Sequence, residues 1–212
     1  MTTEPAPDPR PLLIAAVDQA GRLVDAVTVD DLDHPTPCDD YDVRTLLGHL
    51  VAVERRVAHV LRGGAPYDVP SIVTDVSDDG WAAAWADGRE MLDAALEEEG
   101  VLDRDVQHPA GVFPARAAIF AYVSEYATHG WDLAKALDRR ADLAESLAGA
   151  SLEPVKRFLP AEPRGGRVPF GPVVEVGEDA PPYDRLVGWL GRDPGWRPPG
   201  QASRTADGKA SR

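Results

Sequence analysis

Hydrophobic positions recur every three or four residues along four long stretches of the chain, and this spacing is typical of amphipathic α-helices. Between these stretches lie clusters of proline, glycine and aspartate, which favour turns and loops. Four amphipathic helices joined in this way predict an all-α fold, a four-helix bundle. We expect the helices at Pro11–Val27, Asp42 to about Arg62, Trp81–Gly100, and a fourth that includes Ile119–Leu137.

The C-terminal part of the chain has a different pattern. A weaker helix is predicted at Leu143–Phe158, and a proline-rich stretch with one short helix at Tyr183–Leu190 follows it. We therefore expect the bundle to carry a Pro-rich C-terminal extension rather than a second domain. The predicted division is a disordered lead-in at 1–10, the helical bundle at 11–160, a Pro-rich arm packed on the bundle at 161–200, and a flexible tail at 201–212.

Composition excludes several classes of function. The formal net charge of −14 argues against a nucleic-acid partner, because phosphate binding requires a basic surface. The sequence has neither a long apolar run nor a signal pattern, so we expect no membrane association and a cytoplasmic location. Cys38 is the single cysteine, which excludes an intrachain disulfide and a cysteine-rich zinc module. A metal would therefore need histidine and carboxylate ligands.

Candidate ligands of this kind occur on two of the predicted helices. Glu125 and His129 are four residues apart, so they share one face of the fourth helix. Their alternative interpretation is a surface glutamate beside a hydrogen-bonded core histidine. His49, at the margin of the apolar stripe of the second helix, is the natural third ligand. Two histidines and one glutamate leave an open coordination position, which is typical of a catalytic zinc site.

Four motifs resemble those of a known family, the DinB-like metal-binding proteins related to mycothiol-dependent maleylpyruvate isomerase. The most specific is the string from Glu125 through His129 to Ala134, which follows a histidine on the second helix. The resemblance covers about residues 10–195. Its motifs are Thr36-Pro37-Cys38, Tyr41–Leu50, Glu125–Ala134 and Asp184–Pro194.

The resemblance implies a DinB-like four-helix bundle that holds a divalent metal, usually zinc, through His49, Glu125 and His129. It also implies mycothiol as a cosubstrate. The sequence departs from the family in two ways: Tyr41 stands where many relatives have tryptophan, and the Pro-rich tail does not match the further C-terminal domain of the isomerase. The family fold and the metal ligands are therefore the expectations that the resemblance carries, rather than the maleylpyruvate reaction.

Three other features are candidates for a role in the site. Asp132 lies three residues beyond His129, so it could accept a hydrogen bond from that ligand, contact the substrate, or form a salt bridge. Cys38 precedes a helix, where the helix dipole would lower a thiol pKa and favour a nucleophile, although a small packing residue is the alternative. Arg164 and Arg167 are in a loop, and they could meet an anionic ligand.

We therefore expect a metal-dependent enzyme, a mycothiol-dependent transferase or isomerase that acts on a small electrophilic substrate. In that scheme the metal activates a low-molecular-weight thiol, and Asp132 is the candidate catalytic residue beside the ligands. A hydrolase that uses a metal-bound water is the first alternative. A metal-binding or sensor protein without turnover is the second. The same open coordination position would serve all three.

Overall fold

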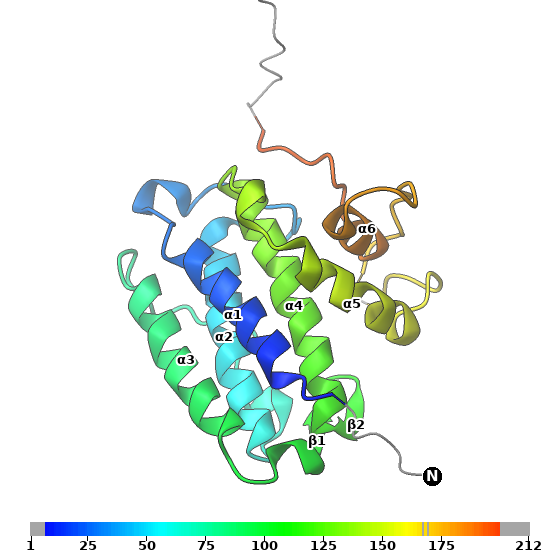
Figure 1. Cartoon of the computed structure of the whole chain (residues 1–212). Helices are drawn as coiled ribbons and strands as arrows, with labels where there is room; N and C mark the ends of the chain where they lie inside the picture. Colours follow the sequence, from blue (N-terminus) through cyan, green and yellow to red (C-terminus); the bar gives the residue numbers. More distant parts are fainter. Residues whose placement is uncertain (1–6, 167, 169, 200–212) are drawn as a thin grey trace, which may run out of the picture.

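Four helices run beside one another and form the body of the molecule in the computed structural model (Figure 1). The structure describes residues 7–166, 168 and 170–199. Within these residues the predicted all-α four-helix bundle is confirmed, and the only sheet is a two-stranded hairpin. The four helices are α1 (Arg10–Val24), α2 (Val43–Leu61), α3 (Trp81–Leu96) and α4 (Ala115–Ala136).

The bundle is held together by side chains from all four helices. Helix α2 packs mainly against α3, and α1 packs mainly against α4. The largest fully buried side chains include Trp131 and Tyr126, both on α4, which places α4 at the centre of the core. Asp42 begins α2 as predicted, because its carboxylate accepts a hydrogen bond from the backbone N–H of Thr45 at 2.8 Å. This cap fixes the start of the helix that carries His49.

Two of the four helices are shorter than predicted. Helix α1 ends at Val24 rather than Val27, since the chain tightens there into bonds between residues three apart, such as Val27 N–H to the Val24 carbonyl at 3.1 Å. Helix α3 ends at Leu96 rather than Gly100, and Gly100 instead adopts the left-handed conformation that begins the next turn. Val27 keeps the apolar spacing of α1 beyond the end of that helix, whereas the end of α3 was predicted at Gly100 because it is the first glycine after the apolar stripe.

The segment between α3 and α4 contains an antiparallel hairpin. It pairs Asp105 with Pro114 and His108 with Gly111. The hairpin leads directly into α4, so it lies beside the start of the helix that carries Glu125 and His129. Its strands are β1 (Asp105–His108) and β2 (Gly111–Pro114), and single-turn 3₁₀-helices occur at η1 (Val29–Asp31), η2 (Pro66–Asp68), η3 (Val101–Asp103) and η4 (Arg140–Asp142).

The C-terminal region adds two further helices, α5 (Glu145–Phe158) and α6 (Pro182–Trp189). Helix α5 packs against α4, and α6 packs mainly against α5 (Figure 1). Tyr183 is fully buried and its hydroxyl accepts a hydrogen bond of 2.7 Å from the side chain of Gln19 on α1. The Pro-rich arm is thus tied to the bundle at a point far away in the sequence.

The ends of the predicted division fall partly outside the described residues. This applies to residues 1–6 of the expected lead-in and to the whole of the expected tail at 201–212. Arg10, the last residue of the expected lead-in, is instead the first residue of α1. No helix among the described residues combines the length and the hydropathy needed to cross a membrane.

Candidate metal centre

The three predicted ligands come together between α2 and α4. His49 Nε2 lies 3.1 Å from Glu125 Oε1, and His129 Nε2 lies 3.7 Å from the same oxygen. One ligand atom from each residue lies within 4.8 Å of the other two. The two imidazole rings are 4.7 Å apart and meet edge to face. The spacing of four residues on α4 and the facing position on α2 thus converge on a single point.

His49 is oriented by a close approach between α2 and the segment after it. A Cβ at Gly48 would lie 2.3 Å from the Val73 carbonyl oxygen, so only glycine lets this segment lie against the helix. The Val73 N–H donates to the Gly48 carbonyl at 3.0 Å and fixes the contact. The Ser71 carbonyl then lies 3.0 Å from His49 Nδ1. Since a carbonyl can only accept, His49 carries its hydrogen on Nδ1 and directs Nε2 toward Glu125.

His129 is oriented by a carboxylate. Its Nδ1 lies 3.0 Å from Oδ2 of Asp132, which is fully buried one turn further along α4. Asp132 in turn receives two hydrogen bonds of 2.8 Å from the guanidinium of Arg192. Burial alone would raise the Asp132 pKa, but the charge of Arg192 and the His129 hydrogen bond lower it. Asp132 is therefore an anion at neutral pH.

Arg192 reaches Asp132 because of the way in which α6 ends. Gly191 has a φ of +83°, and its N–H donates to the Gly188 carbonyl while the Arg192 N–H donates to the Val187 carbonyl. These paired bonds are the Schellman ending of a helix, which needs a residue in the left-handed conformation. The chain reverses there and directs Arg192 toward α4.

The donor set fits a divalent cation. Both histidines direct Nε2 toward Glu125 Oε1, while each Nδ1 is occupied by a hydrogen-bond acceptor. Lone pairs and a carboxylate that converge in this way repel one another unless positive charge lies between them. Protonated imidazoles can supply that charge, and so can a metal ion. Histidine ligands whose other nitrogen bonds a carboxylate or a carbonyl are typical of zinc sites.

The charge of Glu125 agrees with this arrangement. Burial opposes its ionisation, but the hydrogen bond that a protonated His49 donates through Nε2, together with the adjacent His129, outweighs that effect and lowers its pKa to about 2. Its side chain is 37% exposed, against 10% for His49 and 11% for His129. The glutamate is thus the ligand nearest to solvent, and it faces the cavity next to the site.

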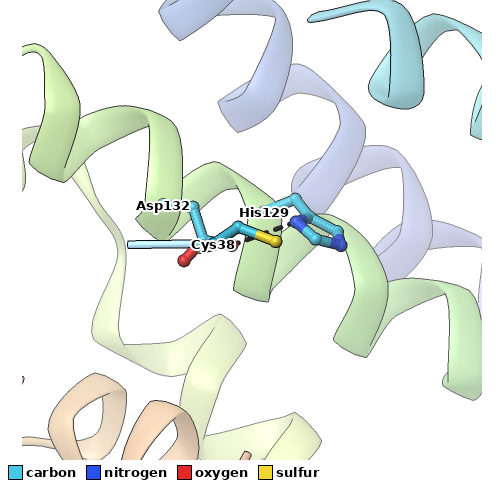
Figure 2. Close-up of side chains that lie close together, drawn as sticks. All are labelled: Cys38, His129 and Asp132. Carbon is cyan, nitrogen blue, oxygen red and sulfur yellow. Dashed lines mark hydrogen bonds and ion pairs between the residues drawn. The ribbon is translucent and has the colours of Figure 1, made fainter. Parts of the chain in front are cut away.

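Cys38 lies close to His129 and Asp132 (Figure 2). Cys38, His129 and Asp132 also have potential ligand atoms within 4.8 Å of one another. The expectation of a lowered thiol pKa is wrong, because burial and the charge of Asp132 raise the pKa of Cys38 to about 11. Asp132 is already bonded to His129 and Arg192. A neutral thiol beside an occupied carboxylate is a packing residue, and this second cluster is the weaker metal candidate.

A cavity of about 280 Å³ opens beside the three predicted ligands. Its walls come from the β-hairpin, α4, α5 and the C-terminal arm, and Glu125 and His129 form part of them. Most of the lining is apolar, and it includes the four aromatic side chains Phe113, Phe120, Phe158 and Phe170. Arg192 is the cation of the described lining. The site therefore borders a hydrophobic chamber.

The remaining histidines lie elsewhere. His34 pairs with Asp31 at 3.6 Å, and His59 pairs with Asp68 at 3.1 Å. His108 lies in the cavity wall, where its ring meets Tyr122 edge to face. This position of His108 was not predicted, because only the hairpin brings it to α4. Of the two loop arginines, Arg164 lies over the Trp189 ring at 5.6 Å, and Arg167 lies outside the described residues.

Sequence reasoning missed two groups that orient the ligands, the Ser71 carbonyl and Arg192. A backbone carbonyl has no signature in the side-chain pattern, so the role of Ser71 could not be predicted. The role of Arg192 could have been predicted, because it belongs to the Asp184–Pro194 motif, in which a glycine directly precedes it after a short helix. That arrangement indicates a helix ending that turns the following side chain back toward the bundle.

Comparison with known proteins agrees with this description. The family model for the mycothiol maleylpyruvate isomerase N-terminal domain matches residues 13–134, which include all three predicted ligands and Asp132. Two similar curated proteins, both named only as uncharacterized, come from Mycobacterium tuberculosis strains ATCC 25618 / H37Rv and CDC 1551 / Oshkosh. Each is 27% identical over 177 residues, which cover 84% of this chain and 93% of the relative. No solved structure matches the chain significantly.

Proposed function

The chain belongs to the mycothiol maleylpyruvate isomerase N-terminal domain family, and from this premise we propose that it is a metal-dependent enzyme that uses a low-molecular-weight thiol. The observation that carries the proposal is the convergence of His49 Nε2 and His129 Nε2 on Glu125 Oε1 beside an open cavity. A divalent metal, most simply zinc, would be held by these three residues. When bound, it would keep a coordinating thiol deprotonated near neutral pH.

Charge favours a thiol over water as the incoming group. Two neutral histidines and one carboxylate leave a divalent ion with a net charge of about +1, which one anionic sulfur neutralises. The thiol would lose its proton to solvent, and its sulfur would form a bond with an electrophilic carbon of the second substrate while a π bond of that carbon breaks and its electron pair takes up a proton from solvent. Release of that product is a transfer reaction, and later expulsion of the thiol is an isomerisation. Mycothiol is the thiol that the family name suggests.

The surrounding residues hold the ligands in place for this chemistry. We assign Asp132 a positioning role: it accepts the hydrogen of His129 Nδ1 and leaves Nε2 free to bind the metal. Arg192 keeps Asp132 ionised. The Ser71 carbonyl accepts the hydrogen of His49 Nδ1 and so leaves Nε2 of that histidine free to bind the metal. Asp132 is fully buried and does not line the cavity. These facts support a positioning role over contact with the substrate.

The same facts weigh against the hydrolase alternative. A hydrolase of this kind needs a general base beside the attacking water. Asp132 is enclosed by Arg192 and His129, and Glu125 is the only carboxylate in the described cavity lining. No side chain of the described lining is thus a carboxylate that remains available as a base. Hydrolase activity is one of the outcomes that the second test below distinguishes.

The first test is metal content. We predict about one equivalent of divalent metal in the purified protein, and loss of most of it in His49→Ala, Glu125→Ala and His129→Ala. The matched control is His59→Ala, which removes an exposed histidine paired with Asp68 and should leave the metal in place. Full metal occupancy in any two of the three ligand variants, measured by elemental analysis, would show that these residues do not form the metal site.

The second test separates the functions. Titration of the cobalt-substituted protein with mycothiol should produce a sulfur-to-metal charge-transfer band in the near ultraviolet, with release of about one proton per site. No band with any thiol, together with metal-dependent cleavage of simple esters, would overturn the thiol proposal in favour of the hydrolase. A band without turnover of any electrophile would favour a binding protein.

A further inference from the structure

We propose that the cavity beside the metal centre binds the electrophilic substrate, and that this substrate is an uncharged molecule with an aromatic or bulky alkyl group rather than a dicarboxylate. This inference rests on the proposed function, since it concerns the second substrate of the same site. It differs from what the family name suggests, because maleylpyruvate is a dicarboxylate. Three observations on the cavity carry it: its wall, its charge and its exposed rim.

The wall of the cavity is aromatic and aliphatic. Phe113 of the hairpin, Phe120 of α4, Phe158 of α5 and Phe170 of the arm face the space from four different segments. Ala117 and Ala121, one turn apart on α4, line the side of the cavity formed by that helix with small apolar side chains. An apolar cavity of about 150 Å³ holds one benzene ring, so a volume of about 280 Å³ accommodates a substituted ring or a branched chain of similar size. Burial of such a group is favourable by about 25 cal/mol per Å² of apolar surface.

The charges of the described lining cancel one another. Arg192 donates through Nε and one Nη to Asp132, so a carboxylate already neutralises it. Burial lowers the pKa of His108, which is therefore uncharged at neutral pH. With one thiolate in place, the net charge of about +1 on the metal and its ligands is also cancelled. A dicarboxylate would bring two further charges into an apolar space without counter-charge, which is costly.

The rim of the cavity exposes a large apolar side chain. Phe158 is 61% exposed at the end of α5, although it also contacts the Phe113 ring edge to face at 6.2 Å. An apolar ligand that enters the cavity would cover this ring. Mycothiol is a poor candidate for the same space, since its sugar hydroxyls would lack hydrogen-bond partners against four phenylalanines. We therefore assign the cavity to the electrophile rather than to the sugar part of the thiol.

The test is a binding measurement that does not require turnover. The probes are N-phenylsuccinimide, which is uncharged and unreactive, and its 4-carboxyphenyl analogue, which differs by one carboxylate. We expect the uncharged probe to bind the metal-loaded protein, saturated with 2-mercaptoethanol so that a thiolate cancels the charge of the metal site, at least 10-fold more tightly in calorimetry at neutral pH. Equal or tighter binding of the carboxylate, or no binding of either probe, would overturn the inference.

Variants localise the binding to this cavity. Ala121→Trp fills the α4 side of the cavity and should weaken the uncharged probe at least 10-fold, whereas Ala86→Trp on the exposed face of α3 should not change its affinity. Phe158→Ala provides a second variant at an exposed position where folding is not at risk, with an expected loss of about 3-fold or more. Unchanged affinity in Phe158→Ala and in folded Ala121→Trp would place the probe elsewhere and reject the assignment.

The probe-binding result can be distinguished from a success or failure of the proposed thiol chemistry. If the uncharged probe binds as expected but no thiol produces a charge-transfer band, the cavity assignment stands and the thiol chemistry fails. If the band forms and only the carboxylated probe binds, the thiol chemistry stands and the substrate class is wrong.

Discussion

The bundle buries two carboxylates without any exposure, Asp132 on α4 and Glu54 on α2, and it treats them in opposite ways. Asp132 has Arg192 and His129 as partners, and its pKa is lowered. Neither carboxylate oxygen of Glu54 has a hydrogen-bond partner among the residues that the structure describes. Burial therefore raises the pKa of Glu54 to about 9, so it is protonated at neutral pH.

The comparison teaches that partners, rather than burial, decide the charge of an acid in this core. Both side chains face the same loss of hydration. Only Asp132, beside the candidate metal centre, is bonded to a guanidinium, which comes from a separate part of the chain. Glu54 lies instead at the crossing of α2 and α3, where a Cβ at Gly88 would come within 2.6 Å of its Oε2. The charged acid orients a ligand, and the neutral one fills space between two helices.

The largest predicted effect comes from removing the partner of Asp132. Arg192→Met leaves a buried anion without its counter-charge and should lower the free energy of unfolding by about 3–5 kcal/mol. Chemical denaturation of the metal-free protein measures this loss. The control is Arg139→Met, which removes an exposed pair with Asp142 and should cost about 1 kcal/mol or less.

The double variant Arg192→Met with Asp132→Asn sharpens the same prediction. It removes both charges, so its cost should be clearly less than the sum of the two single costs, because the two side chains interact directly. Additive costs, or an Arg192→Met variant as stable as the Arg139→Met control, would contradict the ion-pair explanation.

The second prediction concerns Glu54 and pH. Its folded pKa is raised above the unfolded value, so its contribution to stability is complete below its ordinary pKa of 4.5 and is lost as pH rises toward about 9. From pH 5 to pH 8 the wild-type protein should therefore lose roughly 2–4 kcal/mol relative to Glu54→Gln, which cannot ionise.

Denaturant titrations at several pH values measure this difference in slope, so the cost of a buried glutamine amide does not affect the result. Glu90→Gln, at an exposed position of α3, is the control and should follow the wild-type slope. Parallel curves for wild type and Glu54→Gln would show that the buried acid has found a partner after all.

The smallest predicted effect is on metal affinity. Asp132→Asn keeps an oxygen near His129 Nδ1 but removes the negative charge that makes the imidazole a better ligand. We expect affinity in a competitive chelator titration to fall by about 10–100-fold. Asp142→Asn removes a carboxylate of the exposed pair and should leave affinity unchanged. An unchanged affinity in Asp132→Asn would restrict Asp132 to a structural ion pair with Arg192.

The sequence predicts what short-range spacing determines. The apolar stripes and the Asp42 cap locate the four helices, and the four-residue spacing places Glu125 and His129 on one face. Contacts between segments that are distant in the sequence could not be predicted from this spacing. The Ser71 carbonyl depends on an approach that Gly48 permits, and the cavity depends on how the hairpin, α5 and the arm close over α4.

Glu54 was overlooked although the sequence carried a signal. It stands between Val53 and Val57 in the apolar stripe of α2, four residues after Leu50, so its spacing placed it in the core. A charged residue at such a position indicates either a buried partner or a neutral acid. Spacing cannot distinguish the two, because the identity of the groups that face it from α3 decides which one occurs.

The Arg192–Asp132 pair also determines the order in which parts of the site are completed during synthesis on the ribosome. All three predicted ligands have been synthesised by residue 129, whereas the counter-charge of Asp132 follows it by 60 residues. At roughly 5–20 residues per second, this interval lasts several seconds. A nascent chain in that interval has its ligands but not the cation that keeps Asp132 ionised, so it should take up metal more weakly than it does once α6 has docked. For the proposed metal site, the predicted ligands would thus be synthesised several seconds before the residue that completes their affinity.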